Sequence, residues 1–287
     1  MAAPKPARKQ PPAGPPARPN RPKGRPRRWY EGPLPVVGTV VVLGVIVAAL
    51  LLYSQSGGKP APTPAPSAAN DVVTGITGLD PTASLAVGSG GLKSPLKATG
   101  AHGAAPDGAK LQVTYVGAEY CPYCAAERWS LMVALSRFGT FSGVQLTQSS
   151  STDIYPNTPT FTFTKATFEG SSVAFTAVET EDRDQRPLQP LTGAPQAALA
   201  KYDAAGSIPF VDLGDAYYAV GAGFLPDRMQ GLTWHQILDQ VRSYDSPLAQ
   251  QVIGNANWLT AGICRAGATA DACSDSHIQA LEAQLAS

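Results

Sequence analysis

Cys121 and Cys124 are separated by only a proline and a tyrosine, the spacing of a dithiol that can close into a disulfide. The pattern that follows is helical, which places Cys121 at a helix N-terminus. Unpaired backbone N–H groups and the helix macrodipole favour an anion there, so we expect a thiol pKa below ~8.5. Pro122 suits the first helical turn because its missing N–H needs no partner. Cys124, one turn later, would attack a mixed disulfide on Cys121 and release the substrate.

A strand and a helix must hold these two cysteines. Residues 111–116 are rich in β-branched and aromatic side chains, as a buried strand is, and Gly117 ends that run. From Cys121 onward the apolar side chains fall on two neighbouring stripes, which predicts a core helix. Arg137 and Gly139 are signals for its end. The two stripes are Trp129, Met132 and Val133, and Leu131, Leu135 and Phe138.

The segment resembles the active-site segment of the thioredoxin superfamily: a strand, then Ala118-Glu119-Tyr120, the CxxC and a long helix. The Pro-Tyr dipeptide is the one that glutaredoxins typically carry. The run 207–213 (SIPFVDL) resembles the superfamily's proline loop beside the CxxC. The resemblance implies that Pro209 is cis and that the Ile208 backbone pairs with an extended substrate. Substrate-lining roles would fall to Tyr120, Pro122, Tyr123 and Ile208.

A longer string is more specific. Residues 121–129 (CPYCAAERW) and 134–139 (ALSRFG) resemble an uncharacterised family of membrane-anchored, thioredoxin-like proteins of archaea and actinobacteria. The resemblance runs from about residue 70 to the C-terminus. It implies a fold and leaves the activity open.

Other uses of the cysteines remain open. A CxxC can be half of a zinc site, although structural zinc sites usually take two such pairs, or an inert structural pair. Cys264 and Cys273 form a second pair, for which we expect a structural disulfide, with a redox relay to the CxxC as the alternative. The three histidines, His102, His235 and His277, are scattered, and we expect no metal site and no cofactor.

Two groups of acidic residues lie near these motifs. Glu119 and Glu127 flank the CxxC. We expect solvated side chains, the alternative being a general base for Cys124. The acidic run 179–184 is expected to be a solvated loop.

The N-terminal part of the chain predicts a membrane anchor. Residues 1–33 hold nine basic residues and one acid among many prolines, which indicates a disordered, cytoplasmic tail. Residues 34–53 are uncharged and long enough to cross a bilayer as one helix. The positive-inside rule then places residues 54–287 outside the cytoplasm. A cleaved signal peptide is the alternative. Residues 54–69 read as a Pro/Ala-rich linker, and residues 70–287 as the folded domain.

The remaining pattern predicts an α/β domain, thioredoxin-like with insertions at 149–206 and at both ends. The helices expected after the CxxC helix are 191–204, one that begins after Thr233, and most of 246–287. The expected strands are 143–148, 159–164, 172–178, 208–213 and 216–221.

The sequence thus predicts a single-pass, extracytoplasmic thiol–disulfide oxidoreductase. Cys121 would attack, Cys124 would resolve, and Pro209 would shape the substrate groove. Expected partners are thiols and disulfides of exported proteins and an unidentified redox partner. Nucleic acid is not expected as a partner, because no RNA-binding signature accompanies the basic tail. The alternative is a redox-inactive adaptor of the same fold that binds envelope proteins or metal.

Overall fold

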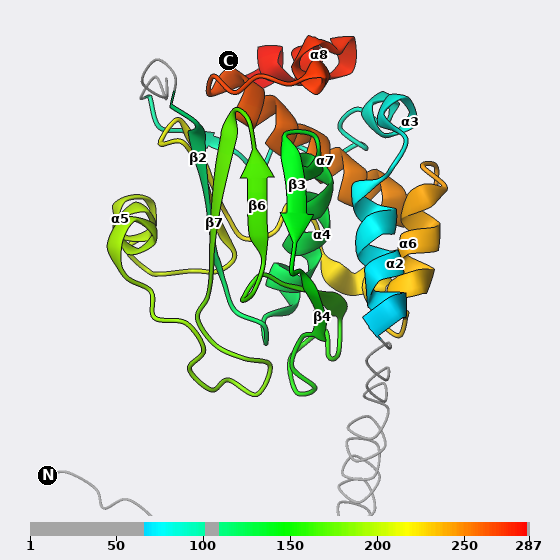
Figure 1. Cartoon of the computed structure of the whole chain (residues 1–287), viewed down its shortest axis with the longest axis vertical. Coiled ribbons are helices and arrows are strands. Elements are labelled where there is room, and N and C mark those ends of the chain that lie inside the picture. Colours follow the sequence, from blue (N-terminus) through cyan, green and yellow to red (C-terminus); the bar gives the residue numbers. More distant parts are fainter. Residues whose placement is uncertain (1–65, 101–108, 286–287) are drawn as a thin grey trace, which may run out of the picture. The chain divides into compact units, whose positions relative to one another are not determined.

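The computed structural model describes residues 66–100 and 109–285 (Figure 1). Its helices are α2 (Pro66–Thr77), α3 (Pro81–Ala86), α4 (Pro122–Ser136), α5 (Gly193–Tyr202), α6 (Trp234–Arg242), α7 (Pro247–Arg265) and α8 (Ser276–Leu285), with 3-10 turns η2 (Pro226–Met229) and η3 (Asp271–Ser274). Its strands are β1 (Lys97–Ala98), β2 (Leu111–Gly117), β3 (Gly139–Ser142), β4 (Gln145–Gln148), β5 (Pro159–Thr162), β6 (Thr167–Gly170), β7 (Val173–Glu179), β8 (Phe210–Leu213) and β9 (Tyr217–Val220).

Five strands form the central sheet, in the order β1-β9-β8-β2-β7. Strand β2 is parallel to β7 and antiparallel to β8, and β8 and β9 form a hairpin. All residues of β2 except Gln112 are buried, which explains its run of β-branched and aromatic residues. At one edge lies β1, whose two residues are both exposed. The predicted mixed α/β class is confirmed.

Helices cover both faces of this sheet. Alternate side chains of a strand point to opposite faces: Val113 and Tyr115 join the main core with α4 and α7, whereas Val116 packs with Phe210 and with Leu199 of α5. In Figure 1, α4 and α7 lie behind the strands and α5 lies apart from them. Almost every residue of α4 is buried, so the predicted core helix is confirmed.

Two further sheets of two strands each accompany the central sheet. The pairs β3–β6 and β4–β5 are antiparallel, and Figure 1 shows β3 and β6 beside β7. The phenylalanine rings of Phe141, Phe163, Phe168 and Phe175 contact one another and join these strands to β7. Strands β1, β3 and β6 were not predicted. The expected strand 143–148 begins at Gln145, because Gly143 has a positive φ and turns the chain.

The N-terminal boundary also differs. Helix α2 begins at Pro66, inside the segment expected to be a linker up to residue 69. Across residues 66–100 and 109–285, no helix combines the length and the apolar character that a membrane span needs. The predicted span, 34–53, and the basic tail lie outside the described residues.

Candidate functional site

The CxxC lies directly after β2, where α4 begins. Cys121 is the N-cap residue, with an extended backbone, and Pro122 opens the helix. The Cys121 sulfur accepts a hydrogen bond from the backbone N–H of Cys124 at 3.2 Å, one of the donors that a helix start leaves unpaired. Cys121 is 6% exposed and Cys124 is 0% exposed. Both thiols are free, and only Cys121 has a surface open to a partner.

The environment lowers the pKa of one thiol and raises the pKa of the other. The pKa of Cys121 is lowered, first by a hydrogen bond from the Cys124 thiol and then by the backbone N–H of Cys124 and the charge of Arg128, against the effect of burial. The pKa of Cys124 is raised well above its ordinary value, first by burial and then by its interaction with the Cys121 sulfur. Of the two thiols, Cys121 is therefore the one that loses its proton more readily.

A buried ion pair lies beneath the cysteines. Nε and Nη2 of Arg128 donate to the two carboxylate oxygens of Glu179 at 2.8 and 2.6 Å, and both side chains are fully buried. Nη2 also donates to the Ala118 carbonyl at 2.7 Å. Glu179 ends β7 beside Gly117 of β2. The expectation that the acidic run is a solvated loop is therefore wrong for Glu179, which the sheet carries inside.

Glu127, expected to be solvated, is also buried, at 1% exposure. Its Oε2 accepts from the backbone N–H of Gly223 at 3.1 Å and from Asn255 Nδ2 at 2.9 Å. Burial raises the pKa of Glu127 to about 7, although these two hydrogen bonds lower it. No hydrogen bond among the described residues joins it to Cys124. Glu119 instead is half-buried and accepts from the Thr147 hydroxyl.

The buried carboxyl of Glu127 should make stability fall with rising pH. Its pKa is raised from 4.5 to about 7 on folding, so the folded state binds more protons across that window. The contribution is present below the unfolded pKa and is lost as pH rises through about 7. In urea unfolding, the free energy of unfolding should be lower at pH 8 than at pH 5. Glu127→Gln should make this difference about 2–3 kcal/mol smaller. Equal losses in both proteins would contradict this.

The loop between β4 and β5 covers the start of α4, which the sequence reading did not foresee. The Ser150 N–H donates to the Tyr120 carbonyl at 2.8 Å. The rings of Tyr123 and Tyr155 meet edge to face, with centroids 5.9 Å apart. Ile154, in the same loop as Tyr155, is 67% exposed. Tyr120 and Tyr123 are half-buried, whereas Pro122 is buried.

The proline loop lies at the same end of the sheet as the CxxC, near the last residues of β2. Pro209 directly precedes β8, whose first residue Phe210 pairs with Val116 near the end of β2. The Ile208–Pro209 peptide bond is cis. Pro209 is buried and Ile208 is half-buried. None of the hydrogen bonds of the described residues involves the Ile208 backbone.

Cys264 and Cys273 are joined by a disulfide at the other end of the domain, between α7 and η3. Arg137, which bonds Thr260 one turn before Cys264, lies about 24 Å from Cys121 along α4 at the usual rise per residue. That separation opposes direct exchange between the two pairs. Because Cys264 and Cys273 are bonded to each other, they also offer no thiolates to a zinc ion at the CxxC.

The double variant Cys264→Ser/Cys273→Ser should lose stability without a change in the reactivity of the Cys121 thiol. The disulfide closes a loop with a sequence separation of 9, for which the entropic stabilisation is about 2–3 kcal/mol. Thermal unfolding should therefore show a lower Tm, while alkylation of Cys121 proceeds at the wild-type rate. A changed alkylation rate in a folded variant would instead indicate that the two cysteine pairs are coupled.

The histidines lie apart from the CxxC motif in the chain. His235 and His277 are exposed, and His277 contacts Asp275. His102 is outside the described residues. Within the described ranges, no three His, Cys, Asp or Glu side chains gather as a metal-binding group.

The fold and this geometry define a mixed α/β domain with a dithiol at a buried helix start. Residues 104–265, more than half of the chain, match the family described as "Domain of unknown function (DUF929)", and the chain belongs to that family. This agrees with the resemblance to an uncharacterised family. Comparison with curated proteins and with solved structures finds no match.

The sequence reading missed Arg128 and Glu179 at this site. Arg128 carried a usable signal, because a lone arginine inside a helix that is apolar around most of its circumference must find a buried acceptor. Glu179 carried none, since it stood in an acidic run. Tyr155 and Ile154 fall in the predicted insertion and have no local signature.

Proposed function

We propose that this protein is a thiol–disulfide oxidoreductase in which Cys121 attacks and Cys124 resolves. The asymmetry of the two thiols carries the proposal. Cys121 keeps a small exposed surface of 6%, accepts a hydrogen bond from a helix-start N–H and has a lowered pKa, whereas Cys124 is fully buried and has a raised pKa. A nucleophilic thiolate beside a protonated resolving thiol is the arrangement that disulfide exchange needs.

The exchange balances as follows. The Cys121 thiolate attacks one sulfur of a substrate disulfide, forms a mixed disulfide and releases the other substrate sulfur as a thiolate. Cys124 then loses its proton to the solvent or to the departing thiolate, and its sulfur attacks Cys121. The Cys121–Cys124 disulfide forms, the second substrate sulfur leaves, and two electrons have passed to the substrate. The reverse sequence oxidises a substrate dithiol.

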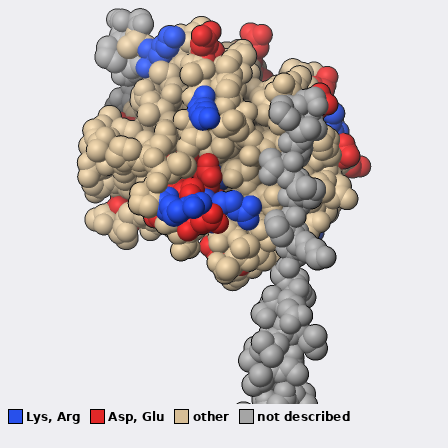
Figure 2. All heavy atoms as spheres, turned by 60° about the horizontal axis from the view of Figure 1, so that its bottom comes forward, with Lys and Arg blue, Asp and Glu red and all other residues tan. Residues whose placement is uncertain are grey.

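The surroundings of Cys121 suit an extended polypeptide. Of the described residues, the exposed large apolar side chains are Ile154, Leu188 and Leu225. Ile154 lies in the loop over the CxxC, Leu188 bonds Thr180 beside the end of β2, and Leu225 follows the loop that bonds Glu127. Figure 2 turns the lower part of Figure 1 forward and shows uncharged atoms around a central cluster of acidic and basic side chains, with further charged side chains towards the rim. The Ile208 backbone would pair with the substrate chain, beside Pro209.

We also propose that the domain is thioredoxin-like. Support comes from the β2–α4–β7 unit with parallel strands, the β8–β9 hairpin antiparallel to β2, helices on both faces, and the CxxC and Pro209 at one edge. The segments β3–β6 and the loop before α5 are then insertions between the two halves.

Residues outside the described ranges support a proposal for the compartment in which the protein acts. An uncharged stretch of membrane-spanning length at 34–53, preceded by a basic tail, supports a single-pass anchor with the domain on the extracytoplasmic side. Disulfides persist in extracytoplasmic compartments, and the Cys264–Cys273 disulfide agrees with such a location. Exported proteins would then supply the substrate thiols and disulfides.

A redox titration of the full-length protein tests the proposal. Equilibrated with glutathione buffers and then alkylated, Cys121 and Cys124 should titrate reversibly as a two-electron couple, within about −270 to −120 mV. A potential near the upper value would indicate an oxidase or isomerase, and one near the lower value a reductase. A pair that does not titrate would overturn catalysis and favour the redox-inactive adaptor.

A further inference from the structure

A cavity lies at the opposite end of α4 from the CxxC. It opens between the C-terminal end of α4, the α2–α3 segment and η3, with a volume of about 440 Å³. That volume falls in the range of ~300–1,000 Å³ typical of small-molecule sites. Its apolar lining comes from Leu79, Leu85 and Val133. Nothing in the proposed thiol chemistry uses this cavity.

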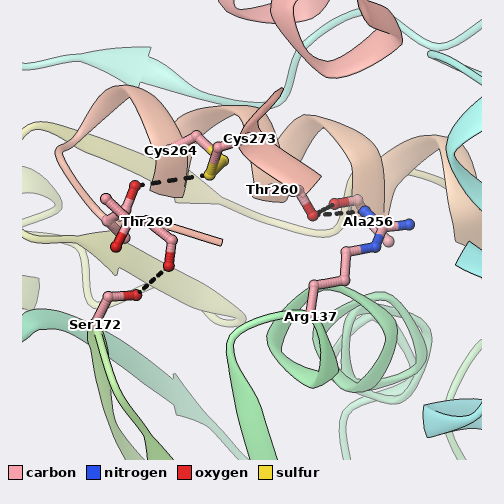
Figure 3. The surroundings of a disulfide bond; sticks show 8 residues. Arg137, Ser172, Ala256, Thr260, Cys264, Thr269 and Cys273 are labelled. Carbon is pink, nitrogen blue, oxygen red and sulfur yellow. Dashed lines mark hydrogen bonds between the residues drawn. A yellow bond between two sulfur atoms is a disulfide. The ribbon is translucent and has the colours of Figure 1, made fainter. Parts of the chain in front are cut away.

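Arg137 is the cation of the cavity. Its Nη1 donates to the Thr260 hydroxyl at 2.6 Å, and Figure 3 shows the side chain reaching from α4 to α7. Its Nη2 is shut off from bulk water and has no hydrogen-bond partner within residues 66–100 and 109–285. Burial lowers the pKa of Arg137 to about 10, although the charge of Asp275 opposes this. Arg137 lines the cavity but forms no ion pair with any described residue, and a largely buried charge without a partner is costly, so the cavity favours a ligand that supplies a carboxylate.

Two carboxylates line the wall formed by η3. Asp271 is exposed and forms no ion pair with any described residue, whereas Asp275 contacts His277 at 3.1 Å. The Cys264–Cys273 disulfide fixes this wall to α7, because Cys273 lies within η3 (Figure 3). The cavity therefore presents one cation, two carboxylates and an apolar surface on elements that are held in place.

We propose that this cavity binds a small zwitterion with an apolar side chain, namely an apolar amino acid or its dipeptide. The ligand carboxylate would pair with the guanidinium of Arg137 where it lines the cavity, while Nη1 keeps its bond to Thr260. The ligand ammonium would lie by Asp271 and Asp275. The apolar side chain would cover Leu85 and Val133. A simple anion would leave both carboxylates uncompensated, and a simple cation would leave Arg137 without a partner.

Calorimetric titration of the full-length protein with leucine and leucyl-leucine tests this. Binding of either is expected, and N-acetylation or amidation of the same ligand should weaken it about tenfold or more, because each removes one charged contact. Arg137→Gln should abolish binding. Asp271→Asn, a change at an exposed residue, should weaken binding several-fold in a folded protein, as thermal unfolding would verify.

The controls separate this site from the thiol chemistry. Asp239→Asn removes an exposed carboxylate of α6 that does not line the cavity and should bind as wild type does. Cys121→Ser should also bind normally, whatever its effect on exchange. Absence of binding at millimolar leucine and leucyl-leucine, equal binding of the blocked ligands, or full binding by Asp271→Asn would overturn the proposal.

Discussion

Cys121→Ser will reduce disulfide exchange by the full-length protein to the uncatalysed rate, whereas Cys124→Ser will accumulate mixed disulfides with its substrates. The difference follows from the geometry. Removing the Cys121 sulfur removes the less buried and more acidic of the two thiols. Removing the Cys124 sulfur leaves the attacking group in place and deletes the buried thiol that would release the product. Insulin reduction with dithiothreitol as electron donor measures the first effect, and non-reducing gels the second.

A matched control uses the other cysteine pair. The Cys264→Ser/Cys273→Ser protein removes the same number of sulfur atoms as Cys121→Ser/Cys124→Ser, but from α7 and η3 near Arg137, which lies about 24 Å from Cys121 along α4. It should reduce insulin at the wild-type rate at a temperature where it is folded. Wild-type rates from Cys121→Ser would end the enzymatic interpretation.

Arg128→Met should cost about 3–5 kcal/mol of unfolding free energy, because it leaves the fully buried carboxylate of Glu179 without its partner. It also removes the hydrogen bond to the Ala118 carbonyl, three residues before Cys121. The charge of Arg128 lowers the pKa of both thiols, so the variant should also have a higher Cys121 pKa. Urea unfolding at pH 7 measures the stability, and the pH dependence of iodoacetamide alkylation measures the pKa.

Arg186→Met is the comparison for that experiment. Arg186 also pairs with two carboxylate oxygens, those of Asp182 and Asp184, but its side chain is 70% exposed. Exposed ion pairs contribute only ~0–1 kcal/mol, so this variant should unfold almost as the wild type does, with an unchanged Cys121 pKa. Similar losses from the two substitutions would show that burial does not set the value of the Arg128–Glu179 pair.

Local signals explain what the sequence predicted well. The start of α4 is specified by residues next to each other: an extended Cys121, a proline at the first helical position and an apolar helix behind them. Thr233 likewise caps α6 with a capping box that closes within four residues. Such contacts join residues that are close in the sequence, so the sequence pattern predicts where α4 and α6 begin.

Contacts between distant residues explain what it did not predict. Arg128 and Glu179 are 51 positions apart, and only the parallel pairing of β2 with β7 brings them together. The loop at Tyr155 reaches Tyr123 through the short β4–β5 hairpin, whose strands have four residues each. Glu127 reads as a surface acid until α7 packs across it and supplies Asn255. Secondary-structure propensity and motif spacing carry no information on these contacts between distant residues.

The short strand β1 bears on aggregation. A protein that handles extended chains runs the risk that they add to an open sheet edge and remain there as an extra strand. Here the edge strand beside β9 is only two residues long, exposes both of them and carries the charge of Lys97. Short, charged edge strands resist the pairing that begins intermolecular sheets. Thus β1 leaves its own edge of the sheet poorly suited to polymerise with the unfolded polypeptides on which we propose that the domain acts.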